Sequence, residues 1–186
     1  IKYLVKSLYY FLKRKISFNV LVLNFLKFLT FPFFIFKKRV KFYSKNVVKN
    51  SKNINVLKNI SINQFVKKNK LKKIFLKIDI EANEYSILND LIDIQDELEC
   101  IVIEFHSIEK NMKKINNFAK KLNLKLIHIH VNNYGSINKK GFPQVLEFTF
   151  AKKSYCVKTN KNIFFPNNKI DFPNNPSGEN KNINFS

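Results

Sequence analysis

Acidic side chains collect where an apolar stretch near the middle of the chain ends. Leu76–Glu84 reads LKIDIEANE, so the apolar residues from Ile74 onward give way to Asp79, Glu81 and Glu84. The apolar run predicts a buried strand, and the residues after it have helical spacing. In an open α/β sheet, ligands bind in the crevice outside the carboxyl ends of the strands. The carboxylates therefore either serve a ligand there or only precede a helix N-terminus, where the helix dipole stabilises acidic groups.

Two further apolar stretches also end in polar residues. In Cys100–His106 these are Glu104 and His106, and in Lys125–Val131 they are His128 and His130, followed by Asn132. Side chains alternate between the two faces of a strand, so the polar residues of each stretch share one face. If the sheet is parallel, all three strand ends lie along a single edge.

Three interpretations of this polar edge stay open. His and carboxylate side chains are the usual general bases, so the edge could position and deprotonate a hydroxyl. The same groups could bind a divalent metal ion. They could also form a hydrogen-bonded network that only closes the edge of the sheet.

The elements that would position these residues alternate between helix and strand. Ser61 and Gln64 have the spacing of a capping box and predict a short helix. After it we expect strands at Leu71–Ile80, Cys100–His106, Lys125–Val131 and Val145–Ala151, and helices at Asn83–Ile94 and around Met112–Leu122. This order predicts an α/β fold with a sheet that is mostly parallel and covered on both faces, and with an antiparallel C-terminal hairpin at one edge.

The charge is concentrated in the first part of the chain. Residues 1–70 contain 17 of the 34 Lys and Arg residues and no acid, within a total formal charge of +21. We therefore expect a basic, Phe-rich segment at 1–59, an α/β domain at 60–158 and an irregular, Pro-containing tail at 159–186. Arg14 and Arg39 are the only arginines, whereas nucleic-acid surfaces usually recruit Arg for bidentate contacts. A nucleic-acid partner is therefore not expected.

The basic segment contains an apolar stretch, Phe18–Phe36, of nearly the length of a membrane span. Lys27 and Pro32 interrupt it, and basic clusters flank it on both sides. It could instead be an interfacial helix whose lysines contact anionic lipid, or a pair of ordinary helices that cover the sheet.

Cys100 and Cys156 have no metal or redox spacing. We expect a cytoplasmic protein, with peripheral contact to an anionic inner membrane as an open alternative.

The polar stretches resemble those of a known family. LKIDIEANE at Leu76–Glu84 is similar to the signature of the FkbM-type methyltransferases, and Ile103–His106 is similar to the strand that follows it in that family. His128–Gly135, Val145–Phe150 and Phe172–Pro176 resemble the closing hairpin and C-terminus of one bacterial branch. The resemblance runs from about Ser61 to the end of the chain.

The resemblance implies a Rossmann-like fold that uses S-adenosylmethionine to methylate a hydroxyl, often on a sugar or glycan precursor. It implies that Asp79 and Glu81 face the cofactor, and that Asp79 or His106 assists proton removal. Glu104 and His106 would line the acceptor side, and we add His130 and Asn132 there. No resident metal is expected in this interpretation.

The chain departs from the family in two respects. Ala82 replaces a family glycine, and the glycine-rich cofactor turn and the ribose-binding acid are missing. The three glycines, Gly135, Gly141 and Gly178, all follow the signature, and no acid precedes Asp79. We therefore expect the C-terminal half of a methyltransferase domain that binds S-adenosylmethionine weakly on its own. The alternatives are a non-catalytic module on a membrane surface and a metal-dependent enzyme that uses the same polar edge.

Overall fold

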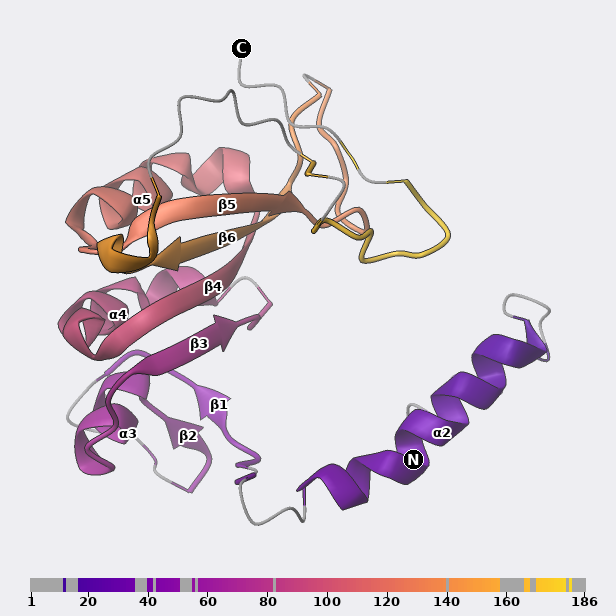
Figure 1. The fold of residues 1–186 in the computed structure, drawn as a ribbon, viewed down its shortest axis with the longest axis horizontal. Coiled ribbons are helices and arrows are strands. Elements are labelled where there is room, and N and C mark those ends of the chain that lie inside the picture. Colours follow the sequence, from indigo (N-terminus) through magenta and orange to yellow (C-terminus); the bar gives the residue numbers. More distant parts are fainter. Residues whose placement is uncertain are drawn as a thin grey trace. The chain divides into compact units, whose positions relative to one another are not determined.

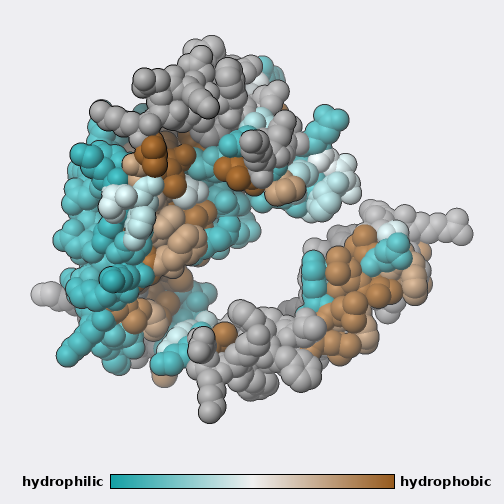
Figure 2. Space-filling model, in the orientation of Figure 1, coloured by the Kyte–Doolittle hydropathy of each residue, from teal (hydrophilic) through white to brown (hydrophobic). Residues whose placement is uncertain are grey.

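The computed structural model describes residues 12, 17–35, 40–41, 43–50, 55, 57–81, 83–139, 141–157, 166–167, 170–179 and 181. They belong to two compact units, 1–44 and 45–186. In the first unit, one helix, α2 (Phe18–Ile35), occupies the apolar stretch. Its exposed apolar side chains are Phe18, Val20, Val22, Leu23, Phe25, Leu26 and Leu29. Figure 2 shows apolar surface over this helix. Among the helices described, none has both the length and the apolar character needed to cross a membrane.

The second unit is built on a four-stranded mixed sheet (Figure 1). Its strands are β3 (Ile74–Ile78), β4 (Leu98–His106), β5 (Lys125–Val131) and β6 (Val145–Ala151), in the order β3-β4-β6-β5. β3 and β4 are parallel, while β6 is antiparallel to both β4 and β5. The sheet is thus not mostly parallel in its pairings, because the antiparallel strand lies inside the sheet rather than at its edge. β3, β4 and β5 still run in the same direction, so their carboxyl ends lie along one edge.

The shorter elements precede and connect these strands. β1 (Asn46–Val47) and β2 (Asn59–Ile60) form a separate parallel pair before α3 (Ile62–Lys68). The expected helix at Asn83–Ile94 is divided into a 3-10 turn, η1 (Glu84–Ser86), and α4 (Leu88–Asp93), and η2 (Gln95–Glu97) follows. α5 (Ile108–Lys121) joins β4 to β5, and η3 (Lys153–Tyr155) follows β6.

Ser61 caps α3, as its spacing predicts. Its Oγ accepts the backbone N–H of Gln64 at 3.3 Å. The Gln64 side chain donates to Asn50 Oδ1 at 2.8 Å. The cap therefore fixes the start of α3, and Gln64 ties α3 to the segment around β1.

The hydrophobic core lies on one face of the sheet. Phe105 of β4 and Phe150 of β6 are buried and pack edge-on against Phe118 of α5, with ring centroids 6.5 and 5.9 Å apart. On the opposite face Phe75 of β3 is 68% exposed. Helices on both faces were expected, and in the described residues this is wrong. Because α4 and α5 are successive crossovers that step across the sheet in the same direction, right-handed connections place both on the same face.

Candidate functional site

The site forms where β3 and β4 end. Asp79 directly follows β3, and His106 is the last residue of β4. The backbone turns sharply after each strand, because Glu81 and Ser107 adopt left-handed conformations with φ of 49° and 51°. These turns direct the chain from β3 into η1 and from β4 into α5.

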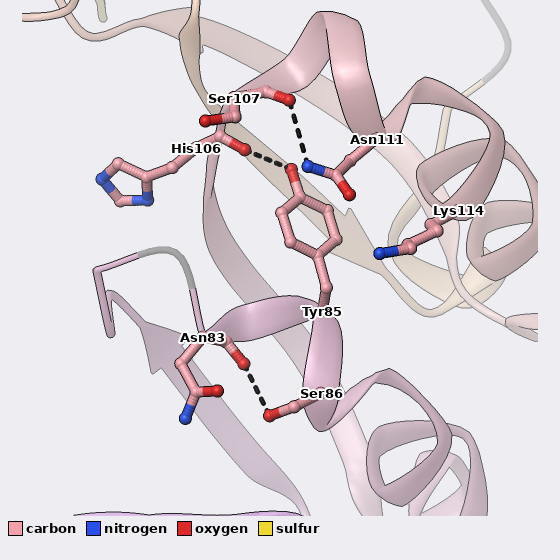
Figure 3. A pocket seen from close by; sticks show the side chains of 7 residues that line it. All are labelled: Asn83, Tyr85, Ser86, His106, Ser107, Asn111 and Lys114. Atoms are coloured by element: carbon pink, nitrogen blue, oxygen red, sulfur yellow. Dashed lines mark hydrogen bonds between the residues drawn. The ribbon is translucent and has the colours of Figure 1, made fainter.

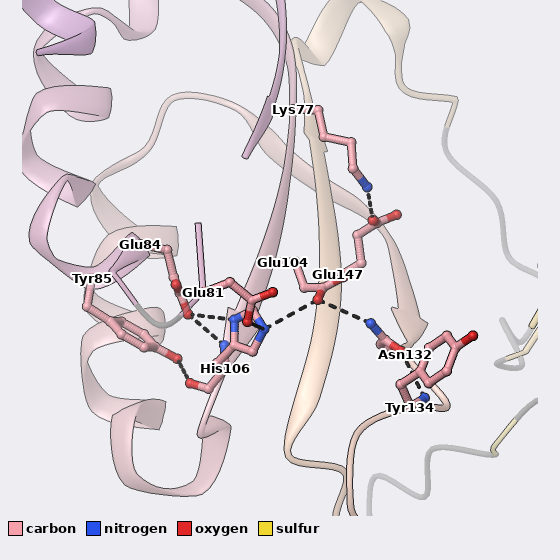
Figure 4. A network of polar contacts seen from close by, with 9 residues as sticks. All are labelled: Lys77, Glu81, Glu84, Tyr85, Glu104, His106, Asn132, Tyr134 and Glu147. Carbon is pink, nitrogen blue, oxygen red and sulfur yellow. Dashed lines mark hydrogen bonds and ion pairs between the residues drawn. The ribbon is translucent and has the colours of Figure 1, made fainter. Parts of the chain in front are cut away.

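His106 is the centre of a polar network (Figure 4). Its ring Nδ1 lies 3.2 Å from Glu84 Oε1. Its Nε2 lies 3.4 Å from Glu104 Oε1 and 3.6 Å from Glu81 Oε2. The His106 side chain is 17% exposed, so the ring is shielded but reaches the surface. One ring nitrogen thus faces the fully buried Glu84, and the other faces the buried Glu104 and the exposed Glu81.

Glu84 and Tyr85 hold His106 in place from the side of η1. Glu84 is fully buried, and its Oε1 also accepts the backbone N–H of His106 at 2.7 Å. The Tyr85 hydroxyl donates to the His106 carbonyl oxygen at 2.5 Å. Burial raises the pKa of Tyr85, and the Glu84 charge raises it further, so the phenol stays a neutral donor. Both the ring and the backbone of His106 are therefore positioned by η1.

Glu104 and Asn132 complete the network on the other side. Asn132 Nδ2 donates to Glu104 Oε1 at 3.1 Å, and Asn132 Oδ1 accepts the backbone N–H of Tyr134 at 2.9 Å. Burial raises the pKa of Glu104, and the charge of nearby Asp79 raises it further. Asp79, Glu104 and His106 each offer an atom that could bind a metal ion, all within 4.8 Å of one another.

The polar rim is the name used here for six residues of this network: Asp79, Glu81, Glu84, Glu104, His106 and Asn132. Side-chain alternation predicted that four of these residues lie close together, and the structure brings them together: Asp79, Glu81, Glu104 and His106. The roles assigned to them stay predictions. His130 lies elsewhere, because Glu147 of β6 stands between it and Glu104 in the register of the sheet. Ala82 falls outside the described residues.

Sequence reasoning left Glu84 and Tyr85 without a role. Glu84 belongs to the same acidic motif as Asp79 and Glu81, so its type and position were available. Its burial was not, because a glutamate after a strand end is normally solvated. The η1 turn places this carboxylate beneath His106 instead of in water.

A pocket of about 390 Å³ opens beside His106 (Figure 3). It is lined by Asn83, Tyr85, Ser86, His106, Ser107, Asn111 and Lys114. Lys114 Nζ lies 5.4 Å from the centroid of the Tyr85 ring, within the range of a cation–π interaction. Hydroxyl, amide and ammonium groups surround the pocket, so it suits a polar ligand of small size.

The rim geometry permits two kinds of chemistry. An imidazole oriented by a carboxylate at one nitrogen can accept a proton at the other. Oxygen and nitrogen ligands of this kind could also bind a divalent cation.

Comparison with known proteins gives a distant likeness of fold. No protein-family model matches the chain, and neither does any curated protein. Among solved structures, M1.HpyAVI is 15% identical with a TM-score of 0.36, and the match covers 64% of each chain. The M1.HpyAVI–SAM complex is 16% identical with a TM-score of 0.35, and the match covers 55% of each chain. The chain thus spans between about half and two thirds of these structures.

Proposed function

We propose that the chain is the C-terminal, acceptor-side part of an S-adenosylmethionine-dependent O-methyltransferase domain of the FkbM type. The observation that supports this proposal is the convergence of His106 with Glu84 and Glu104 at the carboxyl ends of β3 and β4. The resemblance of Leu76–Glu84 and Ile103–His106 to the family signature supplies the reaction class. The acceptor in this proposal is a hydroxyl of a sugar or glycan.

His106 is the proposed general base. Glu84 fixes the ring through Nδ1, so that Nε2 is the atom that meets an acceptor hydroxyl. That hydroxyl would transfer its proton to Nε2, and the carboxylates around the ring would stabilise the positive charge that results. Glu104 and Asn132 would accept and donate hydrogen bonds to neighbouring hydroxyls of the acceptor. Asp79, which lies near His106, is the proposed second catalytic group and would face the cofactor.

The residues of this chain do not complete a site for S-adenosylmethionine. Asp79 and Glu81 offer carboxylates on one side of such a site. The chain has no acid before Asp79 that could bind the ribose hydroxyls, and no glycine-rich turn that could offer backbone donors. Methyl transfer is therefore proposed only for a domain in which another segment supplies the remaining wall.

Two measurements test this proposal. In isothermal titration, the purified chain should bind S-adenosylmethionine weakly or not at all. A low-micromolar dissociation constant that Asp79→Ala abolishes would show that the chain completes the pocket, and the truncated-domain interpretation would be wrong. In NMR titration with methyl glycosides, the His106 imidazole signals should shift, less so in Glu104→Gln. His106 signals that stay unchanged up to the highest glycoside concentration would remove the support for a sugar acceptor.

A second candidate function is that of a membrane-surface module without catalytic activity. The exposed apolar side chains of α2 favour it, together with the basic charge of residues 1–70. In this case the polar rim would serve only to close the edge of the sheet, and neither methyl donor nor glycoside would bind there.

A further inference from the structure

A second cluster of ligating side chains, which shares no residue with the polar rim, lies on the helix-free face of the sheet. His128 and His130 alternate along β5 and point to the same face, where they meet Asp171 of the C-terminal tail. Asp171 Oδ1 lies 2.7 Å from His128 Nε2 and 3.1 Å from His130 Nδ1. Glu147 of β6 separates this cluster from Glu104 in the sheet register.

We propose that His128, His130 and Asp171 form a site for a divalent transition metal ion such as Zn²⁺, called here the tail site. Two imidazoles and one carboxylate are a common protein ligand set for such ions, and they leave one tetrahedral position for water or a further ligand. The three ligating atoms lie within 4.8 Å of one another. Ligands at about 2.0–2.2 Å from zinc stand roughly 3.3 Å apart. Asp171 Oδ1 therefore needs only a small shift away from the two imidazole nitrogens, at 2.7 and 3.1 Å, to admit an ion.

The surrounding hydrogen bonds fit a metal ion. His130 Nε2 lies 3.0 Å from Asn174 Oδ1, an acceptor that requires an N–H at Nε2. A metal ion bound at Nδ1 of the neutral ring leaves Nε2–H to donate to Asn174. Asp171 Oδ2 accepts the backbone N–H of Asn167 at 2.6 Å. Outer partners of both kinds are typical of metal ligands.

The tail site would fasten the tail to the sheet. Asp171 is only 6% exposed, and a buried carboxylate is unfavourable unless it is paired or binds a metal ion. A second anchor lies nearby, where Asn133 accepts the backbone N–H of Asn175 at 2.6 Å and donates to the carbonyl oxygens of Asn175 and Glu179. Since the ligands come from segments that are 41 and 43 residues apart, metal binding would favour the docked tail.

The experiment uses the complete chain, stripped of metal with a chelator and titrated with Zn²⁺ against a competing chelator. We expect one Zn²⁺ per chain, and Asp171→Asn should weaken its affinity by at least about 100-fold, since even outer partners contribute 10- to 100-fold. His106→Ala, in the rim, is the matched control and should leave the affinity unchanged. Loss of binding in His106→Ala with retention in Asp171→Asn would place the ion at the rim and overturn the proposal.

NMR of the unsubstituted chain provides a test that does not depend on a variant's folding. The chain has three histidines, so His106, His128 and His130 account for all the side-chain imidazole signals. On addition of one equivalent of Zn²⁺, the signals of His128 and His130 should shift, and those of His106 should not. Zn²⁺ should also slow proteolysis of the tail between residues 166 and 179. If no His128 or His130 signal moves at millimolar Zn²⁺, there is no tail site.

Discussion

Glu84 shows how strongly one side chain can depend on its position. It is fully buried, and while its Oε1 binds His106 twice, its Oε2 has no hydrogen-bond partner in the described part of the chain. A buried carboxylate with an unpaired oxygen opposes folding unless its other contacts offset the lost hydration. Its presence beneath His106 is therefore better explained by orientation of that ring than by stability.

Replacing Glu84 by Ala should remove the acceptor of the His106 backbone N–H and leave that donor buried and unpaired. We expect the free energy of unfolding to fall by about 1–3 kcal/mol in urea denaturation. Glu81→Ala is the control, because the Glu81 side chain is 89% exposed and its loss should change stability by no more than about 0.5 kcal/mol. Equal effects of the two substitutions would mean that the bond from the His106 backbone N–H to Glu84 contributes nothing to stability.

Glu104 should make stability depend on pH. Burial and the charge of Asp79 raise its pKa above the ordinary value of 4.5, so the folded state holds this proton to higher pH than the unfolded state. Stability contributed by the protonated form is then lost as pH rises from the unfolded to the folded pKa. The measurement is the free energy of unfolding in urea, taken between about pH 4 and pH 8 for the unsubstituted chain and for Glu104→Gln. The decrease with rising pH that Glu104 causes should be missing in Glu104→Gln.

Glu99 provides the contrasting control for this measurement. The hydrogen bond from Lys152 and that from Tyr155 lower its pKa, so its contribution to stability is present above the unfolded pKa and is lost as pH falls. Glu99→Gln should therefore change the slope in the opposite sense to Glu104→Gln. If both substitutions changed the slope in the same direction, the local environments described here would not determine the pKa shifts of the two carboxylates.

At the scale of elements, the four strands of the main sheet could be predicted from the sequence, but the order in which they pair could not. Alternating apolar residues revealed β3 to β6, and the shared direction of β3 and β4 brought Asp79 near Glu104 and His106. The insertion of β6 between β4 and β5 depends on long-range pairing, which local patterns do not contain. For the same reason the contact of Asp171 with β5, across 43 residues, could not be foreseen.

α2 should bind lipid surfaces that carry negative charge. Its apolar side chains are exposed, and the segment around it has 17 basic residues and no acid between residues 1 and 70. Co-sedimentation should therefore be stronger with anionic than with neutral vesicles, and should weaken as salt screens the lysines. Phe25→Ser should weaken vesicle binding because it removes an exposed apolar side chain from α2. Lys139→Ser, in the second unit, is the control. Binding without preference for lipid charge would favour ordinary helix packing for α2.

At the scale of the whole molecule, the second unit should fold without the first. Every buried hydrophobic residue among those described lies at Val66 or later, so the core belongs to residues 45–186. A protein of residues 45–186 should keep the cooperative thermal transition of the complete chain, within a few degrees, when followed by circular dichroism. A broad or absent transition would show that residues 1–44 contribute to the core.

The position of β3 in the sheet has a consequence for solubility. Within the described residues β3 pairs with β4 alone, so the other side of Ile74–Ile78 offers backbone groups to a further strand. An open edge of this kind is a template for aggregation, and Phe75, exposed on the helix-free face of the same strand, adds apolar surface. Two copies carry +21 each at neutral pH and repel one another. The protein should thus stay dispersed at low ionic strength and self-associate as salt screens that repulsion, and an added charge at Phe75 should delay the onset.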